Sequence, residues 1–208
     1  MPALRPTLLT LLLALGLSTS SGCGGARPHS GPPPSDTLVS HAPVRMRGKP
    51  ASPKLRLPQD VKPVEYAVEL TVRPDEPRFE GRVTMTVDLA EMTDVVWMHA
   101  RGLTIVQAYA QVGDARYPLE ALRGEEDFLG LSAPQPLPSG RARISVGYSG
   151  PVSAREVDGV FRVKEGSDWY VFTQFEPLAA RTAFPCFDEP GFKTPWTLSI
   201  TVPQGLPK

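Results

Sequence analysis

The chain contains two cysteines and three histidines, the residue types from which metal sites and nucleophilic sites are most often built. Cys23 and Cys186 form no CxxC or Cys/His pattern, and His29 and His41 lie in a proline-rich segment. His99 lies in an apolar run, so we expect a strand histidine that is satisfied by its neighbours. No HExxH motif occurs. We therefore predict no catalytic residue, no metal ligand and no cofactor in this chain.

Three charged residues, Arg181, Asp188 and Glu189, lie close together near the C-terminal end of the sequence. The forked donors of a guanidinium can pair with two carboxylates and so hold an irregular loop in place. We interpret the three residues as such a scaffold, with acid–base catalysis by the two carboxylates as the less favoured alternative. Cys186 has no histidine near it in sequence, so we expect a buried thiol in the core rather than a nucleophile.

Most of the chain after residue 55 shows the period-two pattern of half-buried β-strands. Apolar residues alternate with mostly polar ones over residues 66–73, 82–89, 144–148 and 198–202. Further apolar stretches that fit strands are residues 95–98, 103–112, 159–163 and 169–175. Turn signals separate these runs, and no longer segment has a helical period. We therefore predict one all-β domain over residues 55–208, an antiparallel β-sandwich.

The first 22 residues have the organisation of a signal peptide. Arg5 precedes an apolar run over residues 8–17, which is too short for a membrane-spanning helix of about twenty residues. Small residues follow, and Ser21, Gly22 and Cys23 resemble the end of a bacterial lipobox. We therefore expect removal of residues 1–22 and lipidation of Cys23. Ordinary secretion, with Cys23 free or in a disulfide, is the alternative.

Residues 23–54 are predicted to be a lipid-anchored, proline-rich linker. Nine prolines occur between Arg27 and Pro63, and proline fixes φ and removes a hydrogen-bond donor, so this segment is not expected to build a sheet. A linker of about thirty residues in an extended polyproline conformation reaches roughly 90 Å. This organisation predicts an exported, membrane-anchored lipoprotein of a bacterial cell envelope, on its periplasmic or extracellular face.

The charge balance argues against a polyanionic partner. Lysine and arginine together number 22, as do aspartate and glutamate, so the formal net charge is zero. The sequence has no basic stripe of the kind that binds nucleic acid. We therefore expect no nucleic-acid partner.

The longest specific pattern in the chain is TQFEPLAARTAFPCFDEPGFK, at residues 173–193. It resembles the signature TQFEPxxARxxFPCFDEPxFK of the aminopeptidase N family of gluzincin zinc metallo-aminopeptidases. Weaker resemblance to the same family occurs at residues 57–58, 63–66, 79–81 and 159–162. Together these segments cover nearly all of the predicted domain.

The resemblance implies a saddle-shaped β-sandwich that is the first domain of such an enzyme and packs on a thermolysin-like zinc catalytic domain. In that family, the position matched by Gln174 lines the pocket for the first side chain of the substrate. The position matched by Glu176 helps to hold the substrate's free α-amine, which is substantially protonated at neutral pH. The implied partner is therefore a peptide with a free N-terminus, and zinc is the cofactor of the parent family.

Two functions remain open at this point. The favoured one is the N-terminal domain of a zinc aminopeptidase that releases N-terminal amino acids from peptides. The HExxH and GxMEN motifs of that family's catalytic domain do not occur in the 208 residues, so we expect the chain alone to be inactive. The alternative is a non-catalytic lipoprotein module whose β-sandwich binds a peptide or a protein.

Lipidation of Cys23 is the first testable prediction. Mass spectrometry of the membrane fraction is expected to show a mature N-terminus at residue 23 that carries lipid. The Cys23→Ser variant should be released as soluble protein, because the lipid is the predicted anchor. Wild-type protein that is wholly soluble and cut at another position would contradict this expectation.

Overall fold

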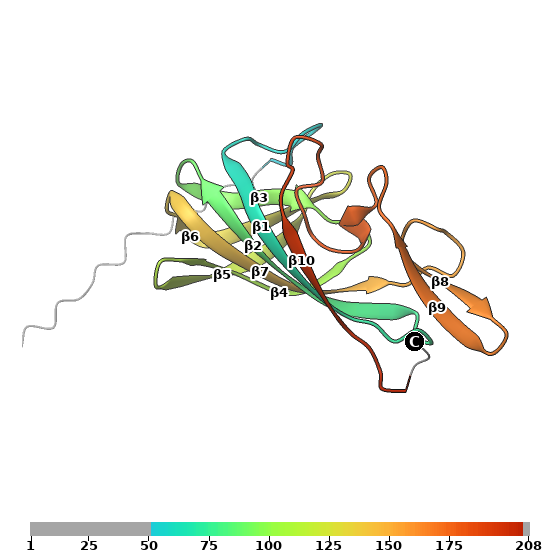
Figure 1. Ribbon diagram of the computed structural model, residues 1–208. Helices are drawn as coiled ribbons and strands as arrows, with labels where there is room; N and C mark the ends of the chain where they lie inside the picture. The colour runs from blue at the N-terminus through green and yellow to red at the C-terminus, as the bar shows by residue number, and fades with distance from the viewer. Residues whose placement is uncertain (1–50, 206–208) are drawn as a thin grey trace, which may run out of the picture. The chain divides into compact units, whose positions relative to one another are not determined.

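The structure, a computed structural model, describes residues 51–205, and nearly all of its regular elements are β-strands (Figure 1). The strands are β1 (Val61–Thr71), β2 (Arg78–Leu89), β3 (Thr93–His99), β4 (Thr104–Val112), β5 (Ala115–Arg123), β6 (Phe128–Leu137), β7 (Gly140–Pro151), β8 (Gly159–Glu165), β9 (Asp168–Gln174) and β10 (Trp196–Thr201). One short 3-10 helix, η1 (Ala180–Thr182), precedes β10. The prediction of an all-β domain is confirmed. No helix within the described range is long and apolar enough to cross a membrane.

Eight strands form one hydrogen-bonded sheet in the order β10-β1-β2-β7-β4-β5-β6-β3. Strand β5 takes part in two ladders, because residues 115–119 pair with β4 and residues 120–123 pair with β6. A strand that switches partners in this way turns a sheet over onto itself. Strands β6 and β3 therefore form a second layer, and the buried apolar residues of both layers belong to one core cluster.

The central strands pack because their apolar residues face the core in register. Val83, Met85 and Val87 of β2 are fully buried. On β7, Val146 lies opposite Val83 and Ile144 lies opposite Met85. Direct cross-strand neighbours have Cβ atoms about 5 Å apart and stabilise the sheet through contact. The apolar residues whose alternation predicted these two strands are thus the residues that face the core.

Strand β10 differs from the sequence-based expectation in two ways. It pairs with β1 in parallel, with Trp196 opposite Tyr66, whereas the other named ladders are antiparallel. Its apolar residues Trp196, Leu198 and Ile200 are also about half exposed, as is Val202 after it. The exposure of these side chains goes with the place of β10 at the edge of the sheet, where a strand has a neighbour on one side only (Figure 1).

Strands β8 and β9 form a separate two-stranded hairpin beside the large sheet (Figure 1). The rings of Phe161 and Phe172 stack across it with centroids 5.7 Å apart. Val163 lies opposite Tyr170 on the same face. Gln174 shares this face as well, because it follows Phe172 by two positions on β9. The hairpin therefore places Gln174 at the end of a partly exposed apolar row.

Strands β5 and β6 were not predicted from the sequence. The pattern of β5 is mostly exposed and contains Pro118, so it shows no clear alternation. In β6, Gly130, Pro134 and Pro136 read as turn signals. The two prolines lie between Ser132 and Leu137, where the ladder to β3 is irregular and no pair to β5 is formed. Proline is compatible with a strand at such a place because no ladder hydrogen bond is lost.

Packing at Gly81 provides a test of the sheet register. The ring of Tyr148, its neighbour on β7, lies where a Cβ of residue 81 would be, and Tyr148 is buried. We expect Gly81→Ala to lower the free energy of unfolding by about 1–3 kcal/mol, measured by urea denaturation, because the ring has to move. Gly191→Ala is the control, since a Cβ there meets no atom within 4 Å. Equal losses in both variants would argue against this packing.

Candidate functional site

The residues of the sequence signature lie on one loop, from Gln174 at the end of β9 to Trp196 at the start of β10. The start of the loop is exposed, but its middle is buried, with Ala183 at 0% and Cys186 at 5% exposure. His99 at the end of β3 exchanges two main-chain hydrogen bonds with Cys186, of 2.8 and 3.0 Å. The loop is therefore fixed to the core through its middle.

Arg181 is the charged residue at the centre of this loop, and it is buried. Its Nε donates to Asp188 Oδ2 at 2.9 Å, and Nη2 donates to the main-chain oxygen of Asp188 at 3.0 Å. Nη1 donates to Asp127 Oδ2 at 3.4 Å. Asp127 lies in the turn between β5 and β6 and also pairs with Arg101 at 3.7 Å. Arg181 thus has a scaffold role, with Asp188 as one of its two expected carboxylates, and it joins the loop to a second segment.

Glu189 does not pair with Arg181, in contrast to the sequence-based expectation. Its Oε1 accepts a hydrogen bond from the main-chain N–H of Leu57 at 2.6 Å. The second carboxylate at Arg181 is Asp127, which is 54 positions away in sequence. No local spacing could have indicated this partner, because only the fold brings the β5–β6 turn beside the loop.

Two buried groups of low reactivity lie at the middle of the loop, and one of them, the Tyr66 hydroxyl, holds it. The main-chain N–H of Phe187 donates to the hydroxyl oxygen of Tyr66 at 3.0 Å. Burial raises the pKa of Tyr66 far above its ordinary value, so this hydroxyl is neutral. Burial likewise raises the pKa of the free Cys186 thiol. Cys186 is therefore a protonated core residue, as predicted, and not an activated nucleophile.

His99 is a buried strand residue, as predicted, and its ring lies against Phe128 with centroids 4.9 Å apart. Its Nδ1 atom is buried and has no hydrogen-bond partner among residues 51–205. The expectation that neighbours satisfy the ring is therefore wrong at this atom. Burial, together with the charge of Arg181, lowers the pKa of His99, although nearby carboxylates oppose the shift. The imidazole is accordingly neutral near pH 7.

Gln174 and Glu176 lie at the exposed start of the loop. Oε1 of Gln174 accepts a hydrogen bond from the main-chain N–H of Glu176 at 3.2 Å, which holds the two residues together. The peptide bond between Glu176 and Pro177 is cis. The carboxylate of Glu176 has no hydrogen bond or ion pair with any residue in the described part of the chain. It is therefore available to a cation from outside the domain.

Half-exposed apolar side chains border this part of the loop. Phe184 contacts Phe175 edge-on, with centroids 6.1 Å apart, and stacks on Trp196 at 6.0 Å. Trp196, Phe172 and Leu178 are each between 47% and 49% exposed. The exposed start of the loop is thus connected to the edge strand β10 by aromatic contacts.

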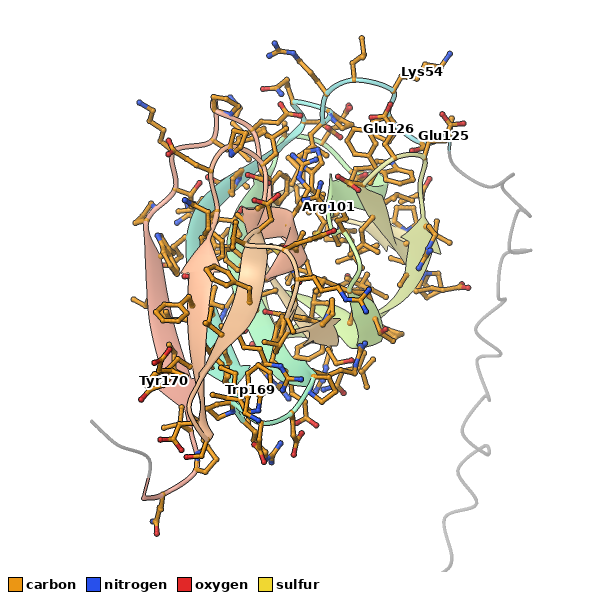
Figure 2. All side chains as sticks on the ribbon, turned by 90° about the vertical axis from the view of Figure 1, so that its right-hand side faces the viewer. Lys54, Arg101, Glu125, Glu126, Trp169 and Tyr170 are labelled. Atoms are coloured by element: carbon orange, nitrogen blue, oxygen red, sulfur yellow. The ribbon has the colours of Figure 1, made fainter. Side chains whose placement is uncertain are left out.

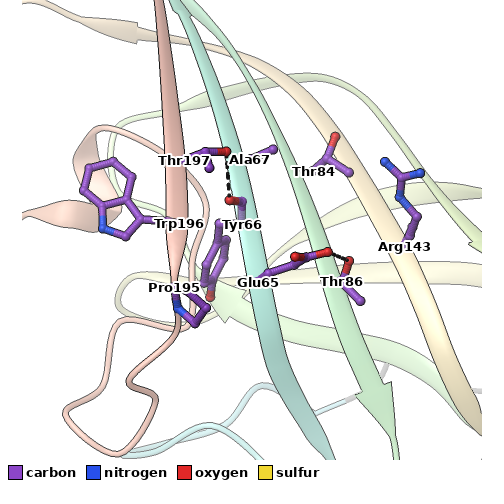
Figure 3. A pocket seen from close by; sticks show the side chains of 9 residues that line it. All are labelled: Glu65, Tyr66, Ala67, Thr84, Thr86, Arg143, Pro195, Trp196 and Thr197. Carbon is purple, nitrogen blue, oxygen red and sulfur yellow. Dashed lines mark hydrogen bonds between the residues drawn. The ribbon is translucent and has the colours of Figure 1, made fainter.

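A shallow pocket of about 220 Å³ lies beside β1, β2 and β10 (Figure 3). Thr86 Oγ1 donates to Glu65 Oε1 at 2.9 Å, and Thr197 Oγ1 donates to the main-chain oxygen of Tyr66 at 3.5 Å. These polar groups pair with one another, and no residue of the sequence signature lines the pocket. It therefore does not indicate a ligand.

Zinc, which the family resemblance implies for the parent enzymes, has no fitting site in this part of the chain. Among residues 51–205, no group of three or more His, Cys, Asp or Glu side chains could hold a metal ion. The carboxylates of Asp127 and Asp188 are engaged by Arg181. We therefore assign no chemical step to a metal within this domain.

Comparison with known proteins identifies the family of this chain. The family described as Peptidase M1 N-terminal domain matches residues 62–206. Endoplasmic reticulum aminopeptidase 1 of Homo sapiens is 31% identical over 204 residues, which cover 93% of this chain and 20% of that protein. Puromycin-sensitive aminopeptidase of Caenorhabditis elegans is 31% identical over 159 residues, which cover 73% of this chain and 17% of that protein. Aminopeptidase A of Gloydius brevicauda is 29% identical over 155 residues, which cover 70% of this chain and 16% of that protein. The chain thus spans about a fifth or less of the length of these relatives.

The ion pair between Arg181 and Asp188 can be tested by removing one partner. Asp188→Ala is expected to lower the free energy of unfolding by about 1–3 kcal/mol, because the buried guanidinium loses a charged acceptor. Urea denaturation measures the loss. Asp168→Ala, at an exposed position on β9, is the control and should stay within about 0.5 kcal/mol of the wild type. An Asp188→Ala variant as stable as this control would show that the pair does not hold the loop.

Proposed function

Because the chain belongs to the peptidase M1 N-terminal domain family, we propose that it is the substrate-binding N-terminal domain of a zinc metallo-aminopeptidase. Such an enzyme releases N-terminal amino acids from peptides, with the chemistry supplied by a zinc catalytic domain that is not part of the 208 residues. The role proposed for this domain is recognition of the substrate's free N-terminus.

The observation that carries the proposal is the state of Glu176. Its carboxylate is exposed and unpaired within the described residues, while residues 183–187, further along the same loop, are buried. An unpaired carboxylate on a well-fixed loop is a suitable partner for a substrate ammonium, because little ordering is needed when the ligand binds. The buried Arg181 and its two aspartates supply the fixation.

The chemistry of the substrate fits a carboxylate at this place. A peptide α-amine titrates near pH 7.7–8.0 and is largely protonated at neutral pH, whereas an internal amide carries no charge. Glu176 would therefore favour chain termini over internal peptide bonds. Gln174 is proposed to line the pocket for the first side chain of the substrate. Its amide oxygen already accepts the N–H of Glu176, so its NH₂ group remains as a donor.

The proposed surface for the zinc catalytic domain is the half-exposed apolar row on β10 together with Leu178 and Phe172. Four apolar residues in one row, from Trp196 to Val202, are about half exposed, which is unusual for a strand at the edge of a soluble domain. The relatives are about five times as long as this chain, so they contain a further domain that could cover such a row. The row is also connected to the substrate loop through Phe184.

We further propose that the enzyme is held at a bacterial cell envelope by lipid on Cys23. This proposal rests on the sequence pattern alone, because Cys23 and the linker over residues 23–54 lie almost wholly outside the described residues. A peptidase displayed in this way would meet peptides outside the cytoplasm.

The test of the proposed function is a chimera in which residues 51–205 replace the matching domain of human endoplasmic reticulum aminopeptidase 1. Glu176→Ala in this chimera is expected to lower kcat/KM for an aminoacyl reporter by about 10- to 100-fold, or about 1.4–2.7 kcal/mol, because a charge-assisted contact is lost. Zinc content should not change. Glu176→Gln should fall nearly as far if the charge, rather than the shape, is what the substrate requires.

The matched control is Glu165→Ala, which removes an exposed carboxylate at the other end of the same hairpin. It should leave kcat/KM unchanged. If both Glu176 variants retained full activity in a folded, zinc-loaded chimera, Glu176 would be a surface acid without a role in binding. The alternative function, a non-catalytic binding module, would then be favoured.

A further inference from the structure

Gly159 is the first residue of β8, and it lies directly opposite Gln174 at the end of β9. It is buried, and its φ of 69° lies in the left-handed region, which favours glycine. A Cβ at this position would overlap Oγ1 of Thr182, the last residue of η1, and would lie 3.0 Å from the Cβ of Thr182. The β8–β9 hairpin and η1 therefore touch at a point where no residue larger than glycine fits without movement.

Hydrogen bonds connect Thr182 to the start of the substrate loop. Its Oγ1 donates to the main-chain oxygen of Ala179 at 2.7 Å, and its main-chain N–H donates to the same oxygen at 3.1 Å. The N–H of Ala179 donates in turn to the main-chain oxygen of Phe175 at 2.8 Å. The two ends of segment 174–179 thus meet at Gly159, the first end through the β8–β9 ladder and the second through Thr182.

Glu176 lies inside this closed segment, and its position depends on its main chain. Its carboxylate has no hydrogen bond or ion pair with any residue from 51 to 205, so no side-chain contact within that range holds it. Its N–H donates to Oε1 of Gln174 at 3.2 Å, and Gln174 is the residue opposite Gly159. A change in the contact at Gly159 would therefore reach the main chain of Glu176 from both ends of the segment.

We propose that Gly159 and Thr182 are positioning residues for Gln174 and Glu176. A side chain at position 159 has to displace Thr182, and Ala179 moves with it because two hydrogen bonds join them. The shape of segment 174–179 then changes, although no residue that contacts the substrate has been altered. The kinetic consequence rests on the proposed function, in which Glu176 binds the substrate's ammonium, whereas the positioning itself does not.

The same hairpin contains a matched control, Gly166, in the turn between β8 and β9. Its φ of 60° is also left-handed, but a Cβ there meets no atom of the described chain within 4 Å. Alanine would strain the backbone similarly at both glycines, so the contact with Thr182 is the difference between them. Figure 2 shows Trp169 and Tyr170, just after this turn, well apart from Arg101, whose main-chain N–H donates to η1 at 2.9 Å.

The first part of the experiment measures position by nuclear magnetic resonance of the purified 208-residue chain. Gly159→Ala is expected to shift the main-chain N–H resonance of Glu176 and the side-chain NH₂ resonances of Gln174, and Gly166→Ala should not. Thr182→Ala adds no atom, so the domain should stay folded, and it should shift the Glu176 resonance because the Ala179 oxygen loses a donor. Gly159→Ala combined with Thr182→Ala should move the resonance back towards the wild type, because the added methyl takes the place of the removed hydroxyl.

The second part measures kcat/KM in the chimera described above. Gly159→Ala is expected to lower kcat/KM by about 10- to 100-fold, because a displacement of about 1 Å at a binding group can cost about 100-fold. Gly166→Ala should leave it unchanged. In a chimera that already carries Glu176→Ala, Gly159→Ala should cost less than about 2-fold more, because it acts through Glu176. General damage to the domain would instead give the same loss in both backgrounds.

Three results would overturn the positioning role. One is a Glu176 resonance that stays at the wild-type position in Gly159→Ala and in Thr182→Ala. Another is an equal shift in Gly159→Ala and Gly166→Ala, which would indicate backbone strain rather than the contact with Thr182. The third is an equal loss of kcat/KM from Gly159→Ala with and without Glu176→Ala. If Glu176→Ala alone had no effect while Gly159→Ala shifted the resonance, the proposed function would fail and the positioning would be supported.

Discussion

The buried guanidinium of Arg181 is the group on which the arrangement of the site depends. Removing a charge from water costs several kcal/mol unless its donors meet acceptors, so a buried arginine fixes the position of every acceptor around it. Here the acceptors are the side chain and main chain of Asp188 and the side chain of Asp127. The loop and the β5–β6 turn are therefore held to each other, and the exposed start of the loop is held by its buried middle.

The same arrangement explains why one part of the signature is rigid and another part is free. The residues from Ala183 to Phe187 are buried and hydrogen-bonded to β1 and β3, which leaves them no access to a substrate. Glu176 and Leu178 are exposed, just before the helical turn that contains Arg181. A recognition residue benefits from this combination, because its own side chain is accessible while its backbone is already ordered.

Local patterns predicted the parts of the structure that depend on local chemistry. Alternation indicated four of the ten described strands and apolar stretches indicated four more, and the burial of Cys186 followed from its isolation in sequence. The signature indicated the family, which the match over residues 62–206 confirms. Contacts between distant segments could not be predicted in this way. The pairing of Asp127 with Arg181, the unpaired Nδ1 of His99 and the exposed apolar row of β10 each depend on which segments the fold places together. Strands β5 and β6 were missed because their prolines and polar residues hide the alternation.

The parallel pairing of β1 with β10 has a consequence for the order in which the chain is made. Tyr66 and Thr197, which contact each other across this ladder, are 131 positions apart. A ribosome adds about 5–20 residues per second, so β1 waits roughly 7–26 s for its last neighbour. During that time one edge of β1 has unpaired main-chain groups, and such an edge readily pairs with another chain. Synthesis of the domain therefore passes through a period in which its first strand has to be protected until its last strand is available.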